Sequence, residues 1–141
     1  MTDSITKTVF LRAPREQVWA FLTEKDKLAR WFHPAEEDLA EGQDYALVAS
    51  SAEGGMVRQC WGTVQHWEPP RKLVYSFTVK PLNGAMTTVT WTLDDVQDGT
   101  RLSLLHEGVG VAAGDAAFGL LMALDKGWDE HLGRLRPLLS A

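Results

Sequence analysis

Asp125 and His106 are ionisable residues that fall within apolar patterns, where such side chains could orient a ligand or move a proton. Asp125 follows the helical spacing of an apolar row that includes Leu121 and Trp128. An unpaired carboxylate in such a row loses hydration, so it needs a partner, a raised pKa or access to water. We expect either that Asp125 points into the mouth of a cavity, or that the helix is slightly rotated and Asp125 is solvated.

His106 ends the alternating row of Leu102 and Leu104 on a predicted strand. Its side chain could face the same cavity from the sheet and pair with Asp125 across it. Such a pair would orient a ligand or act as a general acid and base. The alternative is a structural histidine whose hydrogen bonds are satisfied within the fold. A structure with the two side chains on opposite sides of the helix would exclude the acid–base pair.

The sequence predicts no metal site, no cofactor and no catalytic nucleophile. Cys60 is the one cysteine, so it has no second thiol, and its strand context indicates a buried, inert side chain. The glycine-containing segments lack the lysine and the strand–helix frame of a phosphate loop. No His-x-His or His-x-x-x-His spacing, typical of metal ligands, occurs among the histidines, which are His33, His66, His106 and His131.

The composition is that of an ordinary globular domain, and 141 residues fit one domain spanning positions 1–141. The formal net charge is −5, with 19 acidic and 14 basic residues, so we expect no nucleic-acid partner. No run of about 18 apolar residues predicts a membrane span. No basic stretch followed by an apolar run indicates a signal peptide, so we expect a cytoplasmic location.

The N-terminal part of the chain predicts one strand followed by two short helices. Residues 4–12 carry β-branched side chains with partial alternation, which is typical of a strand. Pro14 opens the first helix, because a proline at the first helical position loses no hydrogen bond, and helical spacing continues through Thr23. The second helix ends at His33-Pro34, because the residue before a proline disfavours the helical conformation.

The middle of the chain, from residue 44 to residue 109, has the pattern of strands joined by short turns. Asn83-Gly84 and Asp98-Gly99 are the strongest hairpin signals. Such strands form an antiparallel meander with one apolar face. The predicted strands of this region are residues 45–50, 56–67, 72–80, 85–96 and 100–107.

The C-terminal part of the chain predicts one long amphipathic helix. Residues 108–114 are small and indicate a flexible connection, and Asp115 is the candidate N-cap. Apolar residues then recur on one side of the helix as far as Leu139, and Pro137 should end or kink the last turn. A curved sheet packed across one long helix cannot fill all the space beneath it, so this order predicts an α+β fold with an apolar cavity.

Seven short motifs are spread over nearly the whole chain, namely residues 13–19, 28–32, 62–64, 69–75, 99–102, 106–108 and 127–128. In this order they resemble the START-like superfamily, also called SRPBCC or birch-pollen-allergen-like proteins. Within it the chain is most similar to the AHSA-type family, named for the activator of a heat-shock chaperone's ATPase. The resemblance implies a helix-grip fold, in which a curved six-stranded antiparallel sheet wraps a long C-terminal helix and leaves a cavity for apolar molecules.

Three functions are compatible with this reading. The leading hypothesis is a non-catalytic protein that binds a small apolar or amphipathic molecule such as a lipid, as a monomer or a homodimer. The second is a cyclase- or hydrolase-like enzyme that uses His106 and Asp125. The third, which the family name implies, is a regulator of a chaperone ATPase. The expected ligand contacts are Trp31, Phe32, Tyr75, Phe77, Trp91, Leu104, His106, Phe118, Leu121, Met122, Asp125 and Trp128.

Two placements remain open from the sequence. Trp31 and Phe32 either line the entrance to the cavity or cap the core, as apolar residues do by default. Strand alternation could point either Cys60 or Trp61 inward, because a bulge near His66 would reverse the faces of the strand.

Overall fold

Residues 4–50, 53–82 and 84–139 are described by a computed structural model, in which one six-stranded antiparallel sheet has the order β1-β6-β5-β4-β3-β2. The predicted α+β class and the curved sheet are confirmed. The strands are β1 (Ile5–Leu11), β2 (Asp44–Ser50), β3 (Met56–Glu68), β4 (Lys72–Val79), β5 (Thr87–Val96) and β6 (Gly99–Glu107).

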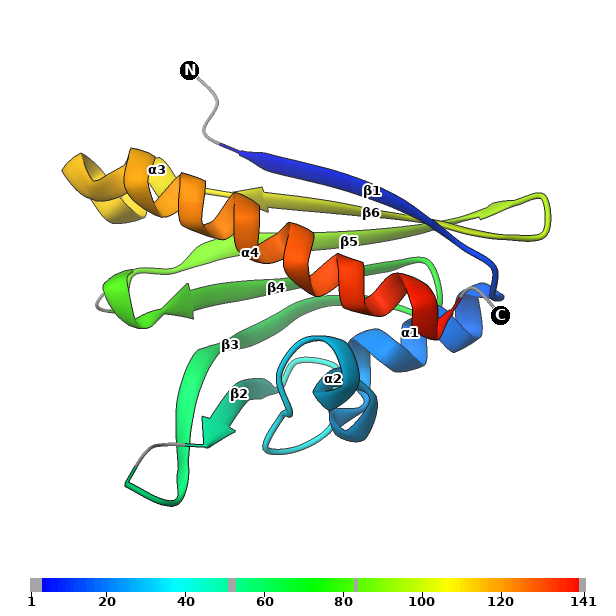
Figure 1. Ribbon diagram of the computed structural model, residues 1–141, viewed down its shortest axis with the longest axis horizontal. Helices are drawn as coiled ribbons and strands as arrows, with labels where there is room; N and C mark the ends of the chain where they lie inside the picture. Colours follow the sequence, from blue (N-terminus) through cyan, green and yellow to red (C-terminus); the bar gives the residue numbers. More distant parts are fainter. Residues whose placement is uncertain (1–3, 51–52, 83, 140–141) are drawn as a thin grey trace.

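The helices have the predicted order, with two short helices after β1 and a long helix at the C-terminus. The long helix crosses the sheet diagonally (Figure 1) and contains Pro137 in its last turn. Within the described part of the chain, no helix is both long and apolar enough to cross a membrane. The helices are α1 (Arg15–Thr23), α2 (Lys25–Trp31), α3 (Val109–Ala113) and α4 (Ala117–Leu138), with 3-10 turns η1 (Lys80–Leu82) and η2 (Gly114–Ala116).

The start of the C-terminal helix differs from the prediction. Asp115 lies within η2 and caps nothing, because α4 begins after Ala116 and its first turn has no side-chain cap. The preceding segment, predicted as a flexible connection, contains α3. Gly108 adopts a φ of 90°, which turns the chain directly after β6, and Val109 is then fully buried. Burial of that side chain favours a packed helical turn over a loop.

The hairpin between β5 and β6 turns one residue earlier than predicted. Val96 pairs with Gly99, so Gln97 and Asp98 form the loop, and Asp98 adopts a φ of 67°. Aspartate tolerates this left-handed conformation better than most residues. Gly99 belongs instead to β6, where a Cβ atom would lie 2.1 Å from the carbonyl oxygen of Leu11. Glycine is therefore needed here for a close approach of two backbones.

The connection between β4 and β5 is longer than a two-residue hairpin. The last pair of the two strands is Phe77 with Thr87, and η1 occupies part of the connection. The predicted turn at Asn83-Gly84 includes Asn83, which lies outside the described residues. Gly84 adopts a φ of 91°, as a turn requires.

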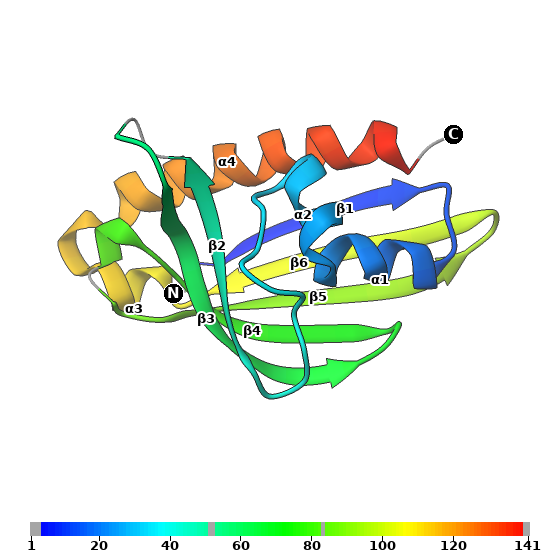
Figure 2. The same cartoon turned by 90° about the horizontal axis from the view of Figure 1, so that it is seen from below.

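The sheet curves most strongly at β3. A Cβ atom on Gly62 would lie 1.9 Å from the carbonyl oxygen of Ser76 in β4, so only glycine permits this approach. The register between the two strands also shifts between Val64 and His66, as at a β-bulge. Figure 2 shows β2 and β3 curling away from the rest of the sheet toward the side where α4 lies. This curl forms one wall of the space under the helix.

An aromatic cluster fills the core where α2, α4 and the sheet meet. The ring centroids of Trp31 and Trp91 are 6.1 Å apart, and those of Trp91 and Trp128 are 5.6 Å apart. Trp31 is almost fully buried, and its indole nitrogen donates to the carbonyl oxygen of Phe21 over 2.8 Å. Trp31 therefore caps the core, which was one of its two predicted placements.

Candidate functional site

A pocket of about 310 Å³ opens between α4 and the β3–β4 part of the sheet. This volume is at the lower end of the range for small-molecule sites. The pocket borders the aromatic cluster at Trp128, which lines it. Its apolar walls are Phe32, Cys60, Phe77, Val79, Leu124 and Trp128.

Trp128 is fixed in this wall by a chain of hydrogen bonds. Its indole nitrogen donates to Nδ1 of His106 over 3.1 Å, and Nε2 of His106 lies 2.7 Å from the hydroxyl of Thr87. Because Nδ1 accepts, the neutral ring carries its proton on Nε2 and donates it to Thr87. The Thr87 hydroxyl in turn donates to the carbonyl oxygen of Phe77 over 2.6 Å. Burial lowers the pKa of His106 to about 4, which keeps this neutral arrangement.

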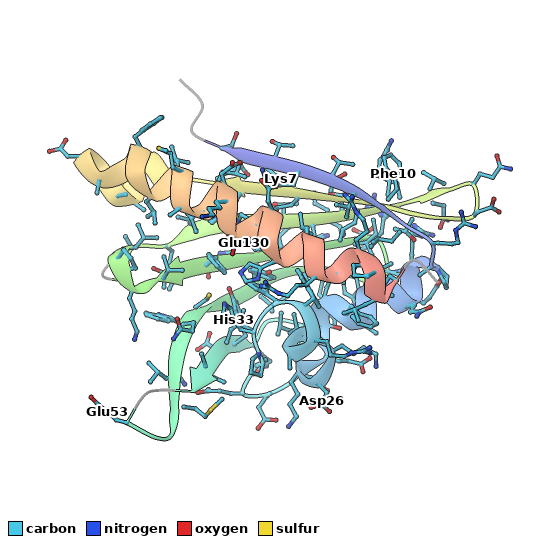
Figure 3. All side chains as sticks on the ribbon, in the orientation of Figure 1. Lys7, Phe10, Asp26, His33, Glu53 and Glu130 are labelled. Carbon is cyan, nitrogen blue, oxygen red and sulfur yellow. The ribbon has the colours of Figure 1, made fainter. Side chains whose placement is uncertain are left out.

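The predicted pairing of His106 with Asp125 is not formed. The Asp125 side chain is 56% exposed and lies 2.7 Å from Nζ of Lys7 in β1, which also contacts Asp129 at 2.9 Å. Figure 3 shows Lys7 and the pocket-lining His33 on opposite sides of α4. Helical rotation thus directs Asp125 to the edge strand, so it takes the solvated placement and does not reach the pocket.

The first turns of α4 also lie outside the pocket. Phe118 and Met122 were expected to contact a ligand, but their side chains are 74% and 61% exposed. They precede Asp125 and Asp129 at helical spacing and share their face of the helix, which is not the face over the pocket. Leu121 is half-buried against the core without lining the pocket.

Three of the expected ligand contacts line the pocket, namely Phe32, Phe77 and Trp128. Four others are buried in the adjoining core and do not line the pocket, namely Trp31, Tyr75, Trp91 and Leu104. Trp91 donates its indole proton to the hydroxyl of Tyr75 over 2.9 Å. The indole N–H of Trp91 is therefore satisfied within the core.

Cys60, rather than Trp61, faces the pocket. Cys60 is buried and pairs with Val79, which also lines the pocket, whereas Trp61 is half-buried. The expected irregularity occurs between Val64 and His66, beyond Cys60, so it does not change the face that the thiol occupies. Burial raises the pKa of the thiol to about 12.

The rim of the pocket is polar and includes Gln59, Lys80, His33 and His131. The rings of His33 and His131 are 5.2 Å apart, and Arg134 donates to Nδ1 of His131 over 2.5 Å. Burial, His33 and Arg134 together lower the pKa of His131 to about 4, while burial and Arg134 lower that of His33. Among the residues that the structure describes, no three side chains of His, Cys, Asp or Glu gather as metal ligands.

Small residues keep the helical side of the pocket open. Ala123 and Gly127 line it, and a Cβ atom on Gly127 would meet no atom within 4 Å. A glycine in a helix interior costs about 1 kcal/mol relative to alanine. The glycines at 119, 127 and 133 of the predicted helix were therefore a signal in the sequence, and His131 follows Gly127 by about one turn.

A family model described as "Activator of Hsp90 ATPase homolog 1-like protein" matches residues 12–140 of the chain. Among curated proteins, no match was found.

Solved structures share the fold over nearly the whole chain. CalU16 from Micromonospora echinospora is 27% identical, with a TM-score of 0.75 over 97% of this chain and 76% of that one. CV1439 from Chromobacterium violaceum is 22% identical, with a TM-score of 0.79 over 99% and 98%. PFC0360w, an HSP90 activator from Plasmodium falciparum, is 23% identical, with a TM-score of 0.76 over 96% and 95%. The last two likenesses concern the fold alone.

Proposed function

This chain belongs to the Activator of Hsp90 ATPase homolog 1-like family, and we propose that it binds a small apolar or amphipathic molecule between α4 and the β3–β4 part of the sheet. The observation that carries the proposal is the pocket of about 310 Å³ with aromatic walls and a polar rim. At about 30 Å³ for each water-sized group, the pocket holds on the order of ten non-hydrogen atoms.

The pocket is built to bind without rearrangement. The Trp128 ring is held by His106, whose other ring nitrogen is engaged by Thr87, so this wall is rigid before a ligand enters. A preformed wall lowers the entropy cost of binding. Removal of apolar ligand surface from water then contributes roughly 25 cal/mol per Å². The fixed wall and the burial of apolar surface support a binding function, which does not involve a chemical reaction.

A larger side chain at position 127 of α4 should abolish ligand binding without destabilising the fold. In Gly127→Leu, the Cβ atom meets no other atom and the rest of the new side chain can occupy the pocket. Affinity for 1-octanol, measured by calorimetry, should therefore fall below detection. Stability should stay equal or rise by up to about 1 kcal/mol, because glycine is unfavourable in a helix.

Gly133→Leu is the matched control for this experiment. Gly133 lies in the same helix, has equally open space around its Cβ position and does not line the pocket. This variant should bind 1-octanol as the parent does. If Gly127→Leu also keeps the parent's affinity, the pocket is not the binding site.

A second candidate function is contact with a chaperone ATPase of the Hsp90 type. The supporting observation is a set of exposed apolar side chains on α3 and α4, with Val111 93%, Phe118 74% and Met122 61% exposed. PFC0360w, which has the same fold, is an HSP90 activator. Phe118→Glu combined with Met122→Glu should then weaken binding to the chaperone in a pull-down, without changing affinity for 1-octanol.

A further inference from the structure

The rim of the pocket carries a basic side chain. Among the residues that the structure describes, Lys80 is the one lysine or arginine that lines the pocket, and it is exposed. Among the described lining residues there is no aspartate or glutamate, although the sequence carries 19 acidic residues and a net charge of −5. Glu130 on α4 is exposed and does not line the pocket. The rim is therefore a local exception to the charge of the protein.

The two histidines at the rim lie near a further positive charge, that of Arg134. Burial is the largest cause that lowers the pKa of His33 and of His131, and Arg134 contributes to both, because its guanidinium disfavours a second positive charge nearby. Figure 3 shows His33 beneath α4, on the side away from Lys7. Arg134 donates to Nδ1 of His131, so the neutral ring carries its proton on Nε2, and the ring also has a hydrogen bond with the Trp31 backbone.

We infer that the polar group of the bound molecule is a carboxylate, held at the rim near Lys80, Gln59 and His131 with its apolar tail against Phe77 and Trp128. The inference rests on the proposed binding function and specifies the class of ligand. A carboxylate accepts hydrogen bonds and carries a negative charge, which is what a lysine, an amide and an imidazole N–H complement. The volume of about 310 Å³ suits an acid of roughly eight carbons, which has about ten non-hydrogen atoms.

Three probes with the same tail test the inference, namely octanoate, 1-octanol and octylammonium, titrated into the protein by calorimetry at pH 7.5. Octanoate should bind about fivefold more tightly than 1-octanol, which corresponds to a solvent-accessible ion pair of favourable geometry. Octylammonium should bind more weakly than 1-octanol, because Lys80 at the rim repels its positive charge. If 1-octanol binds as tightly as octanoate, the carboxylate inference is wrong while the binding function stands. If none of the three binds, the binding function itself is wrong.

A variant of Lys80 tests whether the preference for octanoate over 1-octanol arises at the rim. In Lys80→Met, the ratio of octanoate affinity to 1-octanol affinity should fall to about one. Lys126→Met is the matched control, because Lys126 is exposed on α4 and does not line the pocket. The control should keep the parent's ratio. An unchanged ratio in Lys80→Met, or an equal fall in Lys126→Met, would overturn the assignment of the carboxylate to this rim.

Discussion

Trp128 lies between two histidines that share a lowered pKa but differ in their surroundings. Its ring centroid is 6.0 Å from that of His106 on the sheet side and 6.1 Å from that of His131 on the rim side. Burial is the largest cause in both cases and lowers each pKa to about 4. His106 is fully buried and both of its ring nitrogens contact protein groups, whereas His131 is half-buried and lines the pocket.

A shifted pKa does not by itself identify a functional histidine. Perturbed pKa values gather at functional sites, but structural networks also produce them. The difference lies in the hydrogen bonds and in access: His106 has no capacity left for a ligand, and His131 borders an open pocket. His106 should therefore matter for stability and His131 for binding.

The largest expected effect is on stability in His106→Leu. The indole N–H of Trp128 and the hydroxyl of Thr87 would each lose a buried partner. An unsatisfied buried group costs about 1–3 kcal/mol, so we expect a loss of about 3 kcal/mol in the free energy of unfolding, measured by urea denaturation. A loss below about 1 kcal/mol would show that the network is not structural.

Acid should weaken the fold through His106 and, less strongly because its side chain is more exposed, through His131. The pKa of His106 is about 4 in the folded state, below its ordinary value of 6.5, so the unfolded chain binds the proton first. The resulting stability is complete above pH 6.5 and is lost as the pH falls toward 4, by about 3 kcal/mol at 1.36 kcal/mol per pKa unit. Urea denaturation at several pH values should show this slope, and His106→Gln should make it shallower. Equal slopes would contradict the assignment.

A smaller effect on stability is expected for His131→Gln. The side chain is at the rim, and a glutamine oxygen can still accept from Arg134. We expect a change below about 1 kcal/mol in the free energy of unfolding, as for most partly exposed positions. A loss as large as that of His106→Leu would remove the distinction between the two histidines.

The smallest effect is expected for Asp125→Asn. Lys7 keeps its contact with Asp129, and exposed ion pairs contribute about 0–1 kcal/mol, so stability should change by less than about 0.5 kcal/mol. Affinity for 1-octanol should be unchanged, because Asp125 does not line the pocket. A loss of affinity for 1-octanol in calorimetry would show that Asp125 takes part in ligand binding after all.

Local patterns in the sequence were sufficient to predict the helices and strands, but they could not predict which face of α4 packs against the sheet. Strand alternation and helical spacing are short-range properties, so the bounds of β2 and β3 agree with the prediction to about one residue. Phe118 and Met122 have the same spacing and polarity as core residues, yet both are exposed. Which of two adjacent apolar stripes faces the sheet depends on packing against distant strands, which no local pattern encodes.

The site was predicted only in part for a related reason. The pocket depends on how α4 crosses β3 and β4, so residues that line it come from separate parts of the chain. Aromatic type alone favoured Trp31 and Trp91, which lie in the core, as much as Trp128. Gly127 and His131 carry no apolar signal and were missed, although a glycine inside a predicted helix is costly enough to need a reason.

The placement of Cys60 bears on how the protein withstands oxidants. The thiolate is the form of cysteine that attacks peroxides and is oxidised by them, and burial raises the pKa of Cys60 to about 12, so very little of the thiol is deprotonated at pH 7. The conversion of Cys60 to sulfenic acid should therefore be slow, and this part of the pocket wall should stay apolar. An accessible cysteine would be oxidised and become polar. The pocket should therefore keep its apolar lining under oxidative stress.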